Sequence, residues 1–292
     1  MGKLNNYFDL AMIVTHQNNE HIFDLLESIS IYNNNLNIYL IIVTQNDLQL
    51  DLKGIPNFNG IQLFQKPSGL SKARNFGIQH LVKNNILFNY IMFPDDDTTF
   101  NNIFFNNFKS IVSLNHNYLF DVYIKDTSDL YISNSLTDGA RITKKNYHSA
   151  MSVNMIISKL YFDSVHYFDE NLGVGAVFGS AEDTDYFLRI VNLSGFFIYT
   201  KQLCNFHPSP ENKYKKLKLI SLINRFINYG NGILFALCKH KMYFAGFIIC
   251  IRAIGGSLLS LIRFNLKLSI AYFISFLFRC ALMFKLLINK NV

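Results

Sequence analysis

Tryptophan is absent from this 292-residue sequence, and proline and cysteine are scarce, with 5 and 4 residues. The cysteines, at 204, 238, 250 and 280, form no CxxC pair, which argues against a zinc site and against a disulfide framework. A reducing compartment is therefore the default expectation. Half of the residues are hydrophobic, which is rich for a soluble enzyme but short of a polytopic membrane protein.

Acidic residues are missing from the last part of the chain. From Lys213 to the C-terminus there are 13 lysines and arginines and no aspartate or glutamate, so residues 1–212 carry a net charge of −6. The basic residues stand among Phe, Leu and Ile, whereas a nucleic-acid binder would usually spread them over polar surface. The pattern indicates an anionic membrane surface as partner, and no nucleic acid. We therefore divide the chain into a domain over 1–212 and a basic, apolar helical region over 213–292.

The first domain alternates strand-like and helix-like segments. Strands are predicted over 8–16, 36–47, 61–67 and 89–97, and helices over 18–33 and 69–84. The first helix has Ile22, Leu25, Leu26 and Ile29 at helical spacing, and the second has Ala73, Ile78 and Leu81, with Ser71 as its expected cap. This alternation predicts a mainly parallel, doubly wound α/β sheet with flanking helices.

Three aspartates, Asp95 to Asp97, directly follow the fourth predicted strand. A surface turn could tolerate their repulsion, since Pro94 and the Asp/Thr run are ordinary turn chemistry. A divalent metal held by hard oxygen ligands would compensate them instead. In an open α/β sheet, ligands bind beyond the carboxyl ends of the strands, where Thr15, His16 and residues 44–47 also fall. This convergence favours a metal or phosphate site.

A second acidic cluster, Glu182, Asp183 and Asp185, begins a helix predicted over 182–195. The helix dipole alone favours acids in a first turn, and that would suffice for Asp185. The Glu182–Asp183 pair is less usual because it follows three glycines, at positions 173, 175 and 179. A flexible loop that delivers a carboxylate to a closed site is what a general base requires.

Together these segments resemble the family-2 glycosyltransferases of the GT-A fold. The resemblance covers residues 8 to about 210 and rests on the ordered stretches "VTH", "GLSKARNFGI", "FPDDDTTF", "FDENLGVGAVFGSAEDTDYFLRI" and "NFHPSPE". It looks closest to bacterial enzymes that build capsule, lipopolysaccharide or exopolysaccharide. It implies an inverting, metal-dependent enzyme that moves a sugar from a nucleotide sugar, with a UDP-sugar expected, to a saccharide or lipid-linked acceptor.

The resemblance also assigns a metal site. Asp95 and Asp97 match the ends of the family's DxD motif. Asp97 would ligate Mg²⁺ or Mn²⁺ bound to the donor diphosphate, and Asp95 would face the ribose or a metal-bound water. Asp96 lies between them and could point either way. His207 matches a histidine after the last core strand that would ligate metal or touch phosphate, although a lone histidine is more often structural.

Five further positions are implied for binding the nucleotide sugar. Thr15 and Asp47 lie where the family holds the nucleoside, although two extra residues displace Asp47 from the end of its strand. Arg74 and Asn75 fall beside the diphosphate, where arginine can pair with phosphate or with an aspartate of the metal site. A position on the helix surface is the alternative for Arg74. Gly69 would leave room for the backbone to approach the ligand.

Asp183 matches the catalytic base of the family, with Glu182 beside it, and the stretch around Asn154 would line the acceptor side. Two other functions stay open. A nucleotidyltransferase of similar α/β fold should have a glycine-rich, basic N-terminal loop, which "VTHQNNEH" lacks. A non-catalytic, membrane-anchored binding module would not need the Asp95/Asp97 and Glu182/Asp183 pairs.

Two apolar stretches, 242–262 and 266–288, are long enough to span a bilayer, which takes about 20 residues. Each has an arginine near its middle, Arg252 and Arg279, and an arginine at the centre of a spanning helix costs about 2.5–3.5 kcal/mol. We therefore expect helices that lie in the interface with their basic side chains snorkelling. A re-entrant hairpin, two true spans and a soluble helical cap are the alternatives. The expected location is the cytoplasmic face of the inner membrane, as a peripheral or monotopic protein.

Overall fold

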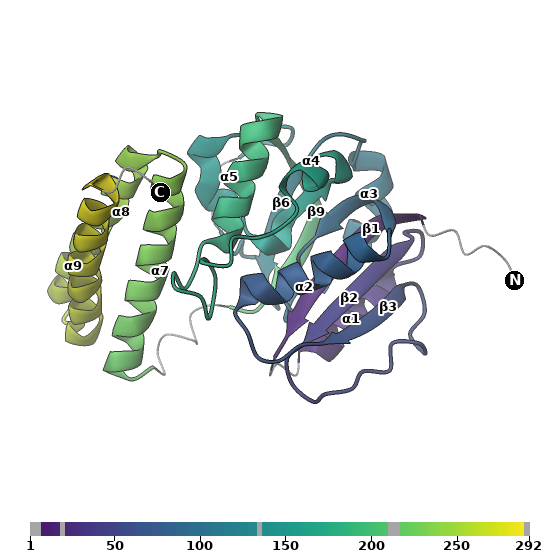
Figure 1. Cartoon of the computed structure of the whole chain (residues 1–292), viewed down its shortest axis with the longest axis horizontal. Helices are drawn as coiled ribbons and strands as arrows, with labels where there is room; N and C mark the ends of the chain where they lie inside the picture. The colour runs from purple at the N-terminus through teal and green to yellow at the C-terminus, as the bar shows by residue number, and fades with distance from the viewer. Residues whose placement is uncertain (1–6, 18–20, 133–135, 210–216, 289–292) are drawn as a thin grey trace, which may run out of the picture. The chain divides into compact units, whose positions relative to one another are not determined.

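The computed structural model describes residues 7–17, 21–132, 136–209 and 217–288 (Figure 1). The chain forms two compact units. The first consists of the chain up to Ser68 together with Lys72–Tyr167 and Tyr186–Ser209, and the second consists of Gly69–Ser71, Phe168–Asp185 and the C-terminal part. The domain boundary predicted at residue 212 lies outside the described residues and stays a prediction.

A mixed, nine-stranded sheet organises the first unit. Its strands are β1 (Tyr7–His16), β2 (Ile38–Thr44), β3 (Asn59–Phe64), β4 (Leu87–Met92), β5 (Thr99–Phe100), β6 (Tyr118–Ile124), β7 (Arg141–Ile142), β8 (Met155–Ser158) and β9 (Phe197–His207). The order across the sheet is β3-β2-β1-β4-β8-β6-β9-β5, with β7 paired to β9. The described helices are α1 (Ile22–Tyr32), α2 (Leu70–Lys83), α3 (Asn102–Ile111), α4 (Lys159–Val165), α5 (Glu182–Ser194), α7 (Leu219–Lys239), α8 (Tyr243–Ile262) and α9 (Leu266–Ile288), with 3₁₀ turns at Lys144–Ser149 and Ser152–Asn154.

The first four strands confirm the parallel, doubly wound half of the prediction. β1 pairs in parallel with β2 and with β4, and β2 pairs in parallel with β3. The apolar runs of β1, β2 and β4 are mostly buried, as expected for strands covered on both faces. Because β2 and β4 flank β1 on opposite sides, the order reverses at β1, and such a switch point is where open α/β sheets bind ligands.

Helices cover both faces of this half of the sheet (Figure 1). The four apolar residues predicted for the first helix are buried in α1 against Leu10, Met12 and Val14 of β1, with α3 in the same cluster. Helix α2 packs on the alternate residues, since its Gly77 lies against Ile13 of β1. The helices therefore follow from the periodicity that predicted them.

Replacing Gly77 by alanine is expected to destabilise the protein by about 1–3 kcal/mol, the usual cost of overpacking a core. A β-carbon there would lie 2.6 Å from Cγ2 of Ile13 and 3.3 Å from Cγ2 of Val43. Gly255→Ala in α8 is the matched control, because a β-carbon there meets nothing within 4 Å. The control should be neutral or stabilising by up to about 1 kcal/mol, since alanine favours a helix. Urea denaturation of both variants measures the difference, and equal midpoints would contradict it.

The other half of the sheet is mixed. β8 is antiparallel to both of its neighbours, β4 and β6, while β6 runs parallel to β9. The register between β6 and β9 shifts between Phe120 and Asp121. The short strands β5 and β7 pair antiparallel to β9. This arrangement places the end of β9, at His207, within reach of the segment that follows β4.

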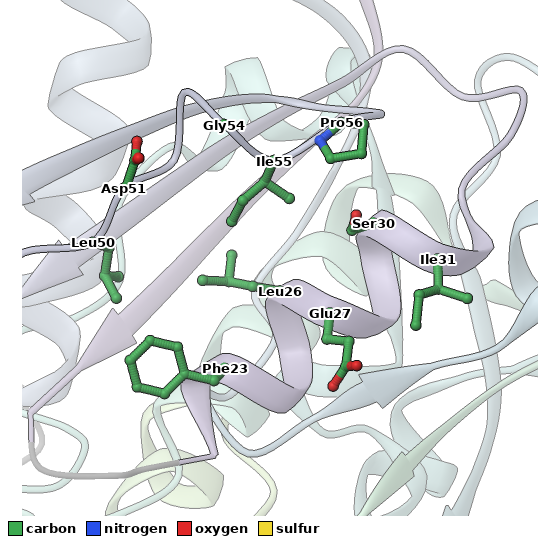
Figure 2. A pocket seen from close by; sticks show the side chains of 10 residues that line it. All are labelled: Phe23, Leu26, Glu27, Ser30, Ile31, Leu50, Asp51, Gly54, Ile55 and Pro56. Atoms are coloured by element: carbon green, nitrogen blue, oxygen red, sulfur yellow. The ribbon is translucent and has the colours of Figure 1, made fainter.

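A groove of about 630 Å³ opens between α1 and the connection from β2 to β3 (Figure 2). Its lining is mostly apolar and includes Phe23, Leu26, Leu50 and Ile55. No residue predicted for the nucleotide or metal site lines this groove. It is therefore separate from the polar strand ends described below.

Helices α7, α8 and α9 form most of the second unit (Figure 1). α8 and α9 are long and apolar enough to cross a membrane, with mean hydropathies of 2.0 and 1.8, and only 28% and 17% of those stretches are buried. Their large exposed apolar side chains include Phe244, Phe247, Phe273 and Phe284. The core of a soluble helix pair would bury such residues, so these side chains are available to an apolar partner.

The two arginines of this hairpin differ. Arg252 is exposed on α8. Arg279 of α9 is half-buried, and its guanidinium donates to the carbonyl of Ile249 at 2.9 Å and to the hydroxyl of Ser275 at 3.1 Å. It packs where Gly230 of α7 leaves room. The prediction that both arginines snorkel is therefore wrong for Arg279. Its guanidinium N–H groups find a hydroxyl and a backbone carbonyl as acceptors inside the helical bundle.

Candidate functional site

The three consecutive aspartates each have a different partner in the first unit. Asp95 Oδ1 accepts from Nη2 of Arg74 at 3.0 Å, and Asp96 Oδ2 lies 2.9 Å from Nδ1 of His16. Asp97 Oδ1 lies 3.1 Å from Nε2 of His207. These partners come from α2, β1 and β9. A solvated turn would not bring a separate basic side chain to each carboxylate, so the turn interpretation of this stretch fails.

The sheet explains why these residues meet. β4 ends at Met92, and the chain beyond it stays beside β1, where Thr15 and Asp95 form an isolated parallel bridge. Thr99 of β5 then pairs with Phe206 of β9, which sets His207 next to the aspartates. Parallel strands end on one edge, and the polar groups that follow them therefore converge.

Asp95, Asp97 and His207 could hold a metal ion together. One ligand atom from each lies within 4.8 Å of the other two. Burial disfavours charge on His207, but hydrogen bonds to Asp95 and Asp97 outweigh it and raise the pKa of His207 to about 10. Two carboxylate oxygens suit Mg²⁺ or Mn²⁺, and an imidazole nitrogen is the softer ligand of the set. The residues fit a divalent cation that takes the place of the proton on His207.

Arg74 is buried, with 1% of its side chain exposed. Besides Asp95, its Nη2 donates to Oγ of Ser152 at 2.9 Å. The alternative of a helix-surface arginine is therefore excluded, and the pairing with an aspartate of the metal site is observed. Asn75 is also buried, at 3% exposure. Two polar side chains inside one turn of α2 indicate a site rather than a solvated helix face.

The positions predicted to hold the nucleoside lie at the ends of β1 and β2. Thr15 is partly exposed and belongs to β1, whereas Asp47 is exposed beyond the end of β2. Gln45, the residue that follows β2, is buried. Its Nε2 donates to Oγ of Ser68 at 3.0 Å. The first side chain after β2 is thus an amide held in place by a serine.

Sequence reasoning placed His16 at the end of the first strand without giving it a role, and it missed Ser152. His16 contacts Asp96, and Ser152 accepts a hydrogen bond from Arg74. A single serine has no sequence pattern that distinguishes it. Asn154, predicted to line the acceptor side, is 4% exposed. Its Nδ2 donates to the carbonyls of Phe120 and Ser149. The amide of Asn154 therefore fixes the backbone, and the prediction that the stretch around it lines the side of the sugar acceptor stays a prediction.

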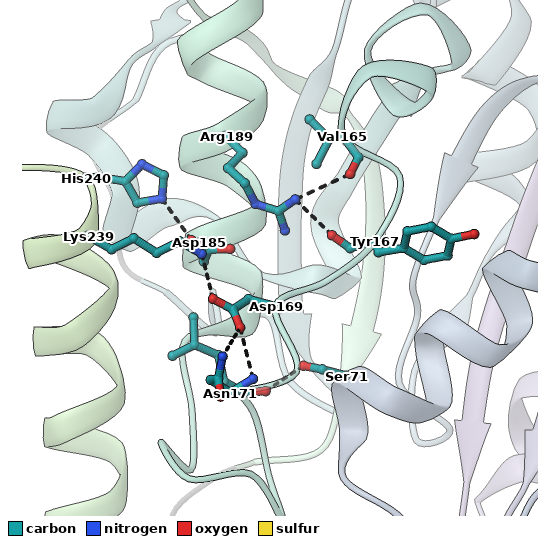
Figure 3. A network of polar contacts seen from close by, with 10 residues as sticks. Ser71, Val165, Tyr167, Asp169, Asn171, Asp185, Arg189, Lys239 and His240 are labelled. Carbon is teal, nitrogen blue, oxygen red and sulfur yellow. Dashed lines mark hydrogen bonds and ion pairs between the residues drawn. The ribbon is translucent and has the colours of Figure 1, made fainter. Parts of the chain in front are cut away.

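The other acidic cluster lies at the start of α5, and Figure 3 shows its Asp185 with the partners of that residue. Its three acids have different surroundings. Asp185 is fully buried, and its Oδ1 lies 2.9 Å from both Nζ of Lys239 and Nε2 of His240. Glu182 is 8% exposed, whereas Asp183 is partly exposed and accepts from the backbone nitrogen of Thr184 at 2.6 Å. Asp185 therefore does more than complement the helix dipole.

The glycine-rich loop before α5 packs on the start of α2 within the second unit. Leu70 N donates to the carbonyl of Val174 at 2.8 Å, and a β-carbon on Gly69 would approach that carbonyl to 3.3 Å. Ser71 was predicted to cap α2, but the helix begins at Leu70 and the Ser71 hydroxyl donates to the carbonyl of Leu172 at 2.6 Å. The cap prediction is wrong because the loop supplies an acceptor.

Gly173 shows why this loop needs glycine. Its φ of +101° is a conformation that side chains rarely adopt. A β-carbon there would lie 2.9 Å from Oγ of Ser71 and 3.3 Å from Oε2 of Glu182. The backbone turn thus leaves room for the Glu182 carboxylate beside the loop.

Comparison with known proteins gives a structural likeness without a sequence match. No protein-family model matches the chain, and no curated protein matches it. The crystal structure of S. aureus TarS 1–349 is 14% identical, with 94% of this chain and 92% of that chain covered and a TM-score of 0.55. The structure of the same TarS segment in complex with UDP-GlcNAc gives the same values. A longer TarS chain is 17% identical, with 80% of this chain but only 43% of that chain covered and a TM-score of 0.53.

At these identities the likeness establishes the fold alone. The mixed sheet, its flanking helices and the matched structures identify the GT-A fold that the sequence resemblance implied, followed by two apolar C-terminal helices. A fold of this kind hosts more than one chemistry, so the function has to be argued from the site.

Proposed function

We propose that this protein is a glycosyltransferase that moves a sugar from a nucleotide sugar to a saccharide or lipid-linked acceptor in the synthesis of bacterial surface polysaccharide. The observation that carries the proposal is the cluster of Asp95, Asp97 and His207 with buried Arg74, at the switch point of a GT-A sheet. We take a UDP-sugar as the donor, since TarS, which shares the fold, has been solved with UDP and with UDP-GlcNAc.

The donor would lie along the ends of β1, β2 and β4. Thr15 and Asp47 would bind the nucleoside, and Asp95 and Asp96 would contact ribose or phosphate. Arg74, held by Asp95 and Ser152, would present a fixed guanidinium near the diphosphate, with Asn75 and Gly69 beside it. These roles fit the observed arrangement, in which the buried guanidinium of Arg74 lies beside clustered carboxylates. The guanidinium can bind the donor diphosphate, and the carboxylates can bind the metal ion that accompanies it.

Asp97, Asp95 and His207 would hold Mg²⁺ or Mn²⁺. The bound cation would neutralise charge on the donor diphosphate and so stabilise the leaving nucleotide. His16 keeps Asp96 out of this ligand set, because the pair lies 2.9 Å apart. The carboxylate in the middle of the motif is therefore a structural or ribose-binding group.

Asp183 would act as the general base, with Glu182 as the neighbouring carboxylate. Asp183 is the least buried of the three acids at the start of α5, so it is the one accessible to an acceptor. It would remove the proton of the attacking hydroxyl during in-line displacement, which inverts the anomeric carbon. Asp185 is already paired with Lys239 and His240 and is unsuited to that task.

A donor screen tests the proposal. The purified full-length protein is incubated with Mn²⁺ or Mg²⁺ and a panel of nucleotide sugars, and released nucleotide is measured with and without candidate acceptors. The proposal expects release from at least one UDP-sugar. Release of pyrophosphate from nucleoside triphosphates would instead identify a nucleotidyltransferase. Tight donor binding without turnover would identify a binding module.

We also propose that the α8–α9 hairpin lies on the cytoplasmic face of the inner membrane. Two apolar helices with most of their surface exposed, in a region with 13 basic residues and no acidic ones, suit an anionic bilayer. Half-buried Arg279 is consistent with this, since its guanidinium is hydrogen-bonded inside the bundle, whereas exposed Arg252 can reach lipid headgroups. A lipid-linked acceptor would then be concentrated at the same surface.

Replacing Phe244 and Phe284 by glutamate should weaken partition onto anionic vesicles by at least about tenfold. Each change removes an exposed aromatic ring that would enter the bilayer and adds a charge that the anionic lipids repel. The two residues are 76% and 68% exposed, on α8 and α9. Leu114→Glu in the first unit, at a residue 65% exposed, is the matched control and should float like the wild type. If wild-type protein stays off anionic and neutral vesicles alike, the hairpin is a soluble cap.

A further inference from the structure

The C-terminal end of α7 makes a partly buried ionic cluster with the glycine-rich loop and α5 (Figure 3). Nζ of Lys239 lies 2.6 Å from Oδ2 of Asp169 and 2.9 Å from Oδ1 of Asp185. Nε2 of His240 lies 2.9 Å from the same Asp185 oxygen. Burial works against the charge of Asp169, but hydrogen bonds from Lys239 and Asn171 hold the pKa of that carboxyl below its usual value. One lysine thus joins both ends of the segment 169–185.

Nearer the middle of α7, small residues allow the helix to pack closely on the same loop. A β-carbon on Gly232 would lie 2.6 Å from the carbonyl oxygen of Ser180, and one on Gly179 would lie 2.8 Å from Cβ of Asn228. The hydroxyl of Ser180 donates to the carbonyl of Tyr229 at 3.0 Å. These contacts lie two to three residues before the Glu182–Asp183 pair.

Aromatic stacking extends this contact. The rings of Phe178 and Phe235 stack with their centroids 4.1 Å apart. Together with the ionic cluster, the contacts run along α7 from Asn228 to His240. The loop that carries the two acids is therefore braced by a helix that follows it by about 40 residues in sequence.

We propose that Lys239 and His240 are positioning residues for the carboxylate pair at the start of α5, and that α7 is a working part of the active site rather than of the membrane anchor. This inference rests on the proposed function, since it concerns where Asp183 is held during turnover.

The physical reason is that Asp185 is fully buried and sits two residues after Asp183 in the first turn of α5. A buried carboxylate needs a partner, and removing that partner leaves an uncompensated charge that forces the turn to rearrange. The positive charge of Lys239 also complements the C-terminal end of the α7 dipole, as the acids complement the N-terminal end of α5. A displacement of about 1 Å at a reacting group can cost about 10²-fold in rate.

The test compares Lys239→Met, Lys239→Arg and His240→Gln with wild type in the full-length protein. Measured quantities are kcat and KM for nucleotide release from the donor found in the screen, together with the melting temperature. Lys239→Met should lower kcat by about 10- to 100-fold and leave the donor KM within about twofold, because only the base is misplaced. Lys239→Arg should recover most of kcat. His240→Gln keeps a hydrogen-bond donor toward Asp185, so its kcat should lie between that of Lys239→Met and that of the wild type.

Lys159→Met is the matched control. It breaks a Lys159–Asp163 ion pair of 2.6 Å on α4 in the first unit, so it removes one lysine and one ion pair far from α7 in sequence. Its kcat should equal that of the wild type. Because kcat is normalised to the amount of donor-binding protein, a purely structural loss lowers the yield or melting temperature without moving kcat.

A wild-type kcat in Lys239→Met overturns the inference, and so does a loss confined to the donor KM. If Lys239→Met does not fold, His240→Ala decides in its place, with the same expected split between kcat and KM. A wild-type protein that turns over no nucleotide sugar contradicts the proposed function instead, and the two failures are thereby distinguished.

Discussion

Replacing Asp97 by alanine is expected to abolish metal-dependent turnover, with a loss of about 10²–10³-fold or more in kcat, while the fold is retained. Removing one preorganised group that stabilises developing charge typically costs this much. Asp97 is one of three possible metal ligands, and its oxygen lies 3.1 Å from Nε2 of His207. Without it, the cation would keep only Asp95 and His207 as protein ligands among the three. Nucleotide release and nucleotide binding with Mn²⁺ measure the effect.

Asp96→Ala is the informative comparison, because Asp96 pairs with His16 and lies outside the ligand set. It should reduce turnover far less than Asp97→Ala. Circular dichroism and the melting temperature check that both variants fold. Full activity of the wild type in saturating EDTA would contradict the metal role, whatever the variants do.

Long apolar runs made the first half of the fold predictable. The stretches that became β1, β2 and β4 are buried on both faces, and the four apolar residues of α1 recur at helical spacing, so composition and period agree. The second half was not predicted strand by strand. β5, β7 and β8 have two to four residues each, too few to show a period, and their antiparallel pairing depends on partners distant in sequence.

The candidate site was predictable where several residues share one pattern. The aspartate run and the glycine loop with its acidic pair stand out in the sequence. Arg74 could be proposed as a site residue only because it lies in the stretch "GLSKARNFGI". Ser152 and Lys239 have no such signal, since each is a single common residue whose partner is brought to it by the fold. In the sequence, Asp185 cannot be distinguished from an acid that only complements the helix dipole. Its role depends on Lys239 and His240 at the end of α7, which the fold brings to it.

Asp183→Asn is expected to lower kcat by about 10²–10⁴-fold, the usual contribution of a general base, and to leave donor affinity within about twofold. A base acts on the acceptor hydroxyl in the transition state, so its loss should not affect binding of the donor in the ground state. The partly exposed carboxylate at the start of α5 is the one that an acceptor can reach. Turnover is measured as nucleotide release, and donor affinity by calorimetry with Mn²⁺.

Glu182→Gln and Asp185→Asn separate the roles within this turn. Asp185→Asn should lower the melting temperature as well as kcat, because it breaks the buried cluster with Lys239 and His240. Glu182→Gln should lower kcat less than Asp183→Asn, since the Glu182 carboxylate is buried near Gly173 and Ser71. If donor binding collapses in Asp183→Asn, that residue belongs to the nucleotide or metal site. Glu182 would then be the better candidate for the base, and Glu182→Gln should show the loss of kcat with unchanged donor affinity.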